Sequence, residues 1–408
     1  MKKILFLAVG VLLHAEGLKE LIELAKTQND LVVSKSLIQS AKAKVLEAKE
    51  GAYYPTIDIG TYYQRSDDRS PFQVGGIYSG YAKVGMDIYD GGNKDALINQ
   101  AKSELQSSIF EKGDLQKSIA LSIVQDFFTI KSLTDTLTSK DEAKKYLKAQ
   151  LERMKKFYVA EVATKDEVDR IEASYETNLY EMESLQFQIL SLKKSLELSV
   201  GKNVATLESS QFITPIDANY ELADNLKALM AQKDGVIKGS QALESIYYPQ
   251  VKVEDTYSLY EYERADATHP KGESNQNKLL LSVNLRLYDN GIIAKNKEAL
   301  LINAQALDSQ IHYKTKEQQM FFELAQARIQ TMQIKIKSAL SAQKAANSAF
   351  ATIEEKYSAG IVDYVVYLDA LTSKTTANAL YKTSLNDLEM AYAMYYYYAG
   401  KNIEEYIK

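Results

Sequence analysis

The 408-residue sequence contains no cysteine, no tryptophan, three histidines and five prolines. Without cysteine the chain has no disulfide, no thiol chemistry and no lipid attached to an amino-terminal cysteine. His14, His269 and His312 stand apart, without carboxylates at metal-ligand spacing, so we expect no metal or other cofactor. The net charge of -5 provides no basic field for nucleic acid. No catalytic constellation is apparent, and we expect no enzyme.

Long apolar runs are also scarce. Met1-Lys2-Lys3 followed by Ile4–Leu13 has the pattern of a secretory signal peptide, residues 1–15, with cleavage expected after Ala15 or Gly17. An uncleaved amino-terminal helix is the alternative. No later segment has the uninterrupted apolar length of a membrane helix. An exported chain would therefore be periplasmic, secreted or a β-barrel.

Tyrosine is abundant, at 29 residues. Its ring is apolar and its hydroxyl is polar, so it suits surfaces such as bilayer interfaces.

A strand pair occurs twice, once between Tyr53 and Gly92 and again between Tyr247 and Gly291. Alternating residues predict strands at about 56–65 and 81–90, then at about 250–262 and 278–288. Runs of about ten residues suit tilted strands that cross a bilayer. Soluble hairpins lying on a helical layer remain an alternative. Two hairpins leave open edges, so these strands can span lipid only if other chains close the sheet.

Each strand pair is followed by a predicted helical hairpin, at about 92–200 and 291–398. The first proline-free stretch would extend about 100 Å as a helix. After a turn near residues 158–164, the returning helix carries a heptad seam in which Asn178 is the polar exception. The seam residues are Val168, Tyr175, Met182, Ile189 and Leu196.

The two halves read as structural repeats, residues 18–213 and 216–408, because Tyr89 and Tyr288 are separated by the same interval as Tyr158 and Tyr357. Strand-to-helix turns are expected where an Asp closely precedes a glycine, with Asp90 and Asp289 as turn or helix-cap residues. The predicted turn residues are Tyr89, Asp90, Gly92, Tyr288, Asp289 and Gly291.

Tyr357-Ser358-Ala359-Gly360, followed by Tyr367-Leu368-Asp369-Ala370, resembles the second helix-turn motif of the TolC-like outer membrane efflux protein family. The first-half counterpart has Glu161 in place of a glycine and matches at Glu167-Val168. This resemblance implies a mainly α fold with a β-barrel portion. In a homotrimer, twelve strands would close a barrel in outer-membrane lipid, and the helical hairpins would form a periplasmic tunnel.

The resemblance further implies a passive exit duct for efflux or type I secretion. Its implied partners are a periplasmic adaptor (membrane fusion) protein and an inner-membrane pump of RND, ABC or MFS type. Matching positions suggest a periplasmic constriction formed by Tyr357, Asp369 and Glu167. Val362 and Val366 depart from the basic and acidic family residues, and Asp363 is a candidate substitute. Small residues at the turns suggest adaptor docking at Ala160, Glu161, Val162, Ala359, Gly360 and Ile361.

A secreted structural coiled-coil rod or adhesin without a channel is the competing interpretation. It explains the helices and the signal peptide. It does not explain why both hairpins are amphipathic at membrane-spanning length.

Overall fold

The computed structural model describes residues 17–66, 75–204, 207–216, 219–263, 265 and 271–408. The expected signal peptide, residues 1–15, lies outside the described residues, as do His14 and His269.

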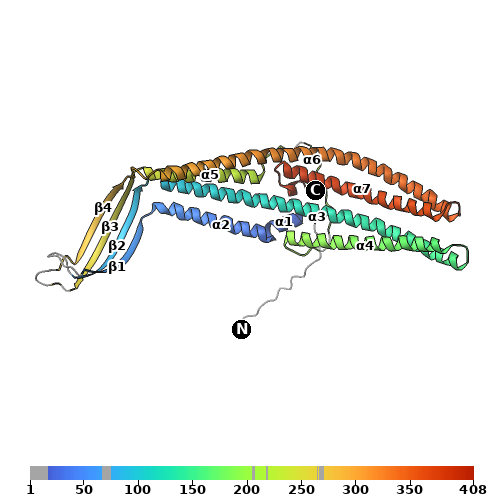
Figure 1. The fold of residues 1–408 in the computed structure, drawn as a ribbon, viewed down its shortest axis with the longest axis horizontal. Helices are drawn as coiled ribbons and strands as arrows, with labels where there is room; N and C mark the ends of the chain where they lie inside the picture. Colours follow the sequence, from blue (N-terminus) through green and yellow to red (C-terminus); the bar gives the residue numbers. More distant parts are fainter. Residues whose placement is uncertain (1–16, 67–74, 205–206, 217–218, 264, 266–270) are drawn as a thin grey trace, which may run out of the picture. The chain divides into compact units, whose positions relative to one another are not determined.

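The chain runs twice through helix, strand pair, long helix and returning helix, and among the described residues only the first series has two helices before its strands (Figure 1). The first series is α1 (Leu18–Gln28), α2 (Asp30–Glu50), β1 (Thr56–Arg65), β2 (Gly76–Tyr89), α3 (Asn93–Val159) and α4 (Lys165–Val200). The second is α5 (Asp224–Glu244), β3 (Gln250–Glu263), β4 (Asn275–Asn284), α6 (Ile292–Ser358) and α7 (Tyr364–Tyr398). Because α3 and α6 each contain 67 residues, the prediction of duplicated long helical hairpins with two β-hairpins is confirmed.

Proline ends the helical segment before each strand pair. Short 3-10 helices, Gly51–Tyr53 and Ser245–Tyr247, lead to Tyr54 (φ -85°, ψ 153°) and Tyr248 (φ -88°, ψ 155°). Each tyrosine precedes a proline, which disfavours helical backbone at the preceding residue. The same sequence feature therefore starts β1 and β3.

The four strands form one antiparallel sheet in the order β1-β2-β3-β4. Register places Ile57 beside Val84, and Asp255 beside Leu279, on one face. The other face carries an ionic cluster in which Lys83 lies 3.7 Å from Asp58 and 3.6 Å from Glu254. The sheet therefore has one mainly apolar face and one polar face.

The strand bounds differ from the sequence prediction on the return strands. β2 begins at Gly76, five residues earlier than predicted, because residues 76–80 pair with the end of β1. β4 begins at Asn275 and ends at Asn284, not at about 278 and 288 as predicted. The ladder stops there because Asn284 pairs with Gln250, the first residue of β3.

Contacts divide the described residues into two compact units that cut across the repeats. Unit 1 takes its residues from 1–35, 112–224 and 314–408, and unit 2 comprises 36–111 and 225–313. In unit 2, Lys233 of α5 lies 2.7 Å from Asp308 of α6, and Ser107 of α3 donates to the Ala228 carbonyl at 3.1 Å.

The core of unit 1 gathers α1, α3 and the ends of α4 and α7. It contains fully buried Leu21, Ile123, Phe127, Leu196 and Ile403. The last residues fold back, since Phe212 bridges to Ile407 and Tyr396 stacks on Tyr406 at 3.8 Å between ring centroids. Both halves of the chain therefore contribute to one core.

Gly113 lies within helix α3. A Cβ at this position would lie 2.9 Å from Asp224 Oδ2. Asp224 in turn pairs with Lys117 at 2.8 Å. The glycine thus gives Asp224 the space to approach α3.

In the described part of the chain, no helix combines the length and apolar character required to cross a membrane.

Candidate functional site at the helix turns

The α3–α4 and α6–α7 turns have the same backbone structure. The Val162 amide donates to the Phe157 carbonyl and the Ile361 amide to the Lys356 carbonyl, both at 2.9 Å. Between these bonds Glu161 (φ 61°) and Gly360 (φ 73°) take the left-handed conformation. These are Schellman motifs, which satisfy the last carbonyls of each long helix.

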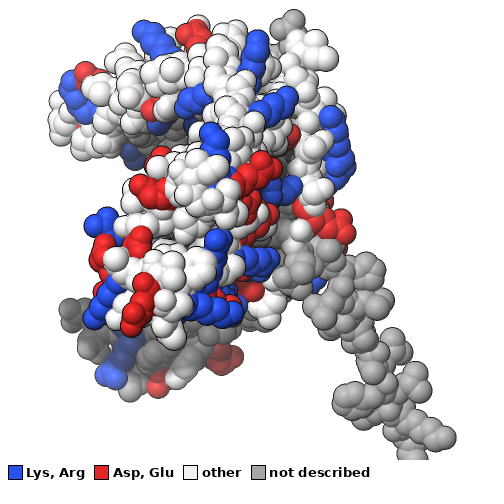
Figure 2. All heavy atoms as spheres, turned by 90° about the vertical axis from the view of Figure 1, so that its right-hand side faces the viewer, with Lys and Arg blue, Asp and Glu red and all other residues white. Residues whose placement is uncertain are grey.

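The residues predicted to dock an adaptor are exposed at both turns. Val162 and Ile361 expose 75% and 72% of their surface, although both are apolar. Ala160, Glu161, Ala359 and Gly360 are exposed too. In the view onto this end of unit 1, basic and acidic side chains of the described residues are interspersed (Figure 2). Both turns therefore expose an apolar side chain, and charges of neither sign dominate the described residues at this end.

Two of the predicted constriction residues hold the start of a returning helix. Glu167 Oε2 accepts from the Thr164 backbone amide at 2.8 Å, at the start of α4. The Asp363 side chain accepts from the Val366 amide at 3.0 Å and caps α7. Each carboxylate satisfies a local backbone donor, as helix-cap residues do.

Tyr357 lies in an aromatic cluster near the turns. Its half-buried ring stacks on Tyr367 with centroids 4.7 Å apart, and its hydroxyl lies 3.8 Å from Met154 Sδ. The Arg153 guanidinium is 5.8 Å from the same ring. Burial raises the pKa of Tyr357. The ring thus joins the end of α3 to the α6–α7 hairpin.

Tyr367 was not predicted as a site residue, yet it is the centre of this cluster. It is 1% exposed, and its hydroxyl is buried together with Gln150 Oε1. Burial is the main cause that raises the pKa of Tyr367. The sequence signal that could have found it is a bulky aromatic residue three positions after the start of the returning helix.

Asp369 differs from the other predicted constriction residues. It is exposed on α7, and the structure gives it no hydrogen bond or ion pair within the described ranges. Tyr357 stacks on Tyr367, and, after burial, the Glu167 carboxylate also raises the pKa of Tyr357, but no hydrogen bond or ion pair within the described ranges joins any two of the four predicted residues.

The strand-to-helix turns are formed by two aspartates in equivalent positions. Asp90 accepts from the amides of Gly92 (3.1 Å) and Lys94 (2.8 Å). Asp289 accepts from Gly291 (3.0 Å) and Ile293 (2.9 Å). Positive φ values at Gly92 (83°) and Gly291 (76°) let the backbone turn from the strand into the helix. Exposed Tyr89 and Tyr288 lie just before each aspartate.

Backbone hydrogen bonds lower the pKa of Asp289, with the Ile293 amide as the largest cause. The Tyr247 hydroxyl also donates to Asp289 at 2.8 Å. Asp289 therefore ties the segment before β3 to the start of α6.

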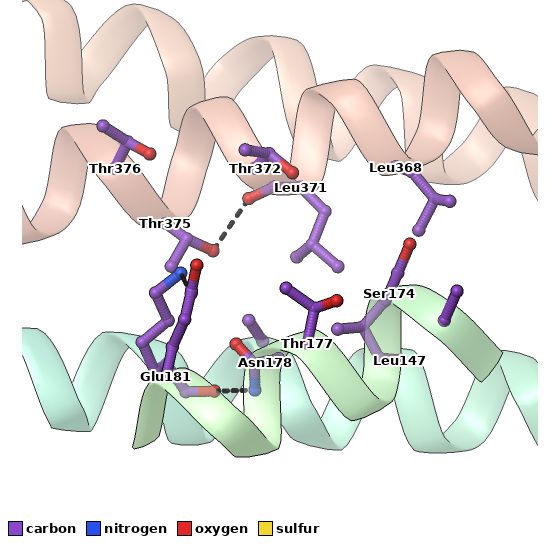
Figure 3. A pocket seen from close by; sticks show the side chains of 13 residues that line it. Leu147, Ser174, Thr177, Asn178, Glu181, Leu368, Leu371, Thr372, Thr375 and Thr376 are labelled. Atoms are coloured by element: carbon purple, nitrogen blue, oxygen red, sulfur yellow. Dashed lines mark hydrogen bonds and ion pairs between the residues drawn. The ribbon is translucent and has the colours of Figure 1, made fainter. Parts of the chain in front are cut away.

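A groove lies between α3, α4 and α7 in unit 1 (Figure 3). Its volume is about 350 Å³, and it is lined in part by Ser174, Thr177, Thr372 and Thr376. Asn178, the exception in the heptad seam, is 5% exposed and donates to the Lys140 carbonyl at 3.1 Å. A polar residue at this seam position thus binds the α3 backbone.

No cluster of three or more His, Asp or Glu side chains that could hold a metal ion occurs among the described residues.

No family model matches the sequence, and no curated protein matches it. Solved structures do. The outer membrane protein VceC of Vibrio cholerae has a TM-score of 0.83 at 14% identity, over 95% of this chain and 96% of that chain. The CmeC outer membrane channel of Campylobacter jejuni has a TM-score of 0.83 at 12% identity, over 94% and 85%. The MtrE outer membrane channel of Neisseria gonorrhoeae, in an open state, has a TM-score of 0.78 at 14% identity, over 95% and 89%.

The chain has the outer-membrane channel fold.

The expected resemblance is confirmed at the level of the fold. A single chain forms both the helical hairpins and the two-faced sheet of this fold. The sheet remains open, since β1 and β4 are its edges.

Proposed function

We propose that this protein is the outer-membrane exit duct of a tripartite efflux or type I secretion system. It would act as a passive conduit for substrates that an inner-membrane pump delivers through a periplasmic adaptor. The observation that carries this proposal is the match over 95% of the chain to a solved outer membrane protein at a TM-score of 0.83. The two-faced sheet fits a barrel wall, with its apolar face toward lipid and its polar face toward the lumen.

The open sheet supports a homotrimer. Unpaired strand edges cannot lie in hydrocarbon, because their backbone groups would lack hydrogen-bond partners. Three chains of four strands would close a twelve-stranded barrel. The helical hairpins would then line a tunnel in the periplasm. Residues 1–15 would be removed on export.

We place the constriction at the helix turns. Asp369 is the strongest candidate for a charged ring, because it is exposed and no described group neutralises it. Tyr357 would position the α6–α7 hairpin through its stacking on Tyr367. Glu167 and Asp363 would contribute chiefly by capping their helices.

The adaptor would contact the exposed turns, including Val162 and Ile361. Bulky charged replacements, Gly360→Glu and Val162→Glu, should disrupt adaptor crosslinking. A drug-resistance or secretion assay in the same cells reads out the complete assembly. Unchanged crosslinking and transport would remove the turns as the docking site. Glu355→Gln, on an exposed part of α6, is the control.

The proposed function is tested by extracting the protein from cell membranes and measuring its mass and conductance. A channel requires detergent for extraction, forms a trimer and conducts in a planar bilayer. A water-soluble monomer without conductance would contradict the proposal and favour a structural rod.

A further inference from the structure

The unpaired edges of the sheet define an interaction surface for a second copy of this chain. We infer that β1 of one copy pairs antiparallel with β4 of the next, with Ile59 directly opposite Val283. This inference rests on the proposed function, because it assumes that three chains close a ring. The partner strands, their faces and the stagger of the sheet together select this register.

The two faces of the edge strands restrict the register first. On β1, Ile57 and Ile59 expose 73% and 83% of their surface, and on β4, Leu281 and Val283 expose 62% and 64%. All four project on the apolar face, as the ladder alternates. A slip of one residue would turn one apolar row toward the polar face. Only register shifts by an even number of residues keep the apolar side chains of β1 and β4 on the same face.

The stagger of the sheet restricts the register further. Through the ladder, Thr56 lies level with Leu280, although β4 continues four residues to Asn284. At the other end, Asn275 lies level with Thr61, four residues before Arg65. β1 and β4 are thus displaced relative to one another along the strand direction by four residues at both ends of the sheet.

This displacement matches the requirement of a closed barrel. Four residues over three strand-to-strand steps extrapolate to about 5.3 residues over the four steps of one chain, and a twelve-stranded ring would then tilt its strands by roughly 40°. That tilt lies in the usual range for barrels. Only an even displacement keeps the apolar faces of the two edge strands together, and the even number nearest to the extrapolated value is about six residues. This displacement sets Ile59 of one copy opposite Val283 of the next.

The same register uses residues beyond the end of β4. Leu285 and Leu287 are 51% and 85% exposed, and residues 284–288 border a groove of about 520 Å³ with Ile246 and Gln250. In one chain these residues lack a strand partner, because β3 begins at Gln250.

In the proposed junction, Ile57 of the second copy faces Leu285. On the polar face, Asp58 of that copy faces Asn284 and lies diagonal to Arg286, so opposite charges meet across the junction. β4 would therefore extend past Asn284 when the chains assemble.

The absence of cysteine makes this register directly testable. The double variant Ile59→Cys with Val283→Cys places two thiols directly opposite between copies. Ile59→Cys with Leu281→Cys, and Ile59→Cys with Leu285→Cys, are matched pairs shifted by two residues on the same face. After oxidation in outer-membrane fractions, we expect reducible dimers and trimers on denaturing gels, at least about 3-fold more abundant for the Val283 pair. Each single variant should remain monomeric on these gels.

Stronger crosslinking of the Leu281 or Leu285 pair would overturn the register. A trimeric, conducting protein without crosslinks in any pair would overturn the edge-to-edge junction while leaving the proposed function intact. A protein that is soluble without detergent and not trimeric would overturn the proposed function, and the inference with it.

Discussion

At the scale of single residues, the two helix turns differ in one informative position. Glu161 and Gly360 both have a positive φ, a conformation that strains a side-chain-bearing residue and suits glycine. We expect Glu161→Gly to stabilise the detergent-solubilised protein by up to about 1 kcal/mol. We expect Gly360→Ala to destabilise it by about the same amount. Denaturant midpoints measure both changes, and a gain in stability from Gly360→Ala would contradict this account.

Glu389 should make the stability of unit 1 depend on pH. Its Oε2 accepts from the Phe212 amide at 2.6 Å, and burial is the main cause that raises the pKa of Glu389 above its usual 4.5. The stability contributed by the neutral acid is complete below pH 4.5 and is lost as pH rises through the raised pKa. Glutamine retains the acceptor without the charge.

We therefore expect Glu389→Gln to unfold at a higher temperature than the wild type at pH 8, with the difference shrinking toward pH 4. Thermal unfolding followed by circular dichroism at both pH values measures this. Glu20→Gln, at an exposed site on α1, is the control and should shift little at either pH. Equal shifts for the two variants would show that burial of Glu389 is not the cause.

At the scale of elements, the strand-to-helix turns depend on their aspartates. Asp289→Ala removes the acceptor for the Gly291 and Ile293 amides, so we expect a lower unfolding midpoint than that of the wild type. Asp289→Asn retains an acceptor and should cost less. Because the pKa of Asp289 is lowered, its contribution is present above its usual pKa of 3.8 and is lost as pH falls below that value.

Unfolding midpoints at pH 7 and pH 3 test this prediction. The difference between wild type and Asp289→Ala should be larger at pH 7 than at pH 3. A difference that does not change with pH would mean that the charged form of Asp289 does not contribute to the turn.

The elements themselves could be predicted from local patterns. Alternation at Ile57 and Ile59 indicated a strand, and the seam at Val168 and Ile189 indicated a long helix. The end of β4 could not be predicted this way, because Leu285 continues the alternation and only the start of β3 ends the ladder. Strand ends depend on which neighbour is present.

The candidate site was predicted less completely than the fold. The turn glycine at 360 and the capping aspartates carry local signals, namely backbone preference and spacing to a glycine. The burial of Tyr367 against Tyr357 arises from packing between α6 and α7, which a pattern along one helix does not record. Asn178 likewise appeared as a defect in the seam until its bond to α3 was seen.

At the scale of the whole molecule, three copies of Asp369 would form a ring of negative charge on the tunnel axis. Such a ring attracts cations and repels anions. We expect Asp369→Asn to lower cation selectivity, measured as the reversal potential of a single channel in a salt gradient. Glu355→Gln on exposed α6 serves as a control with the same loss of charge. An equal effect of both variants would mean that selectivity follows net charge and not position.

Single-channel conductance of the purified protein in a planar bilayer tests the central claim most directly. The account predicts that a detergent-extracted trimer opens a small, steady conductance, which rises roughly twofold or more when Tyr357 or Asp369 is replaced by alanine. A protein that remains soluble without detergent and carries no current would contradict it.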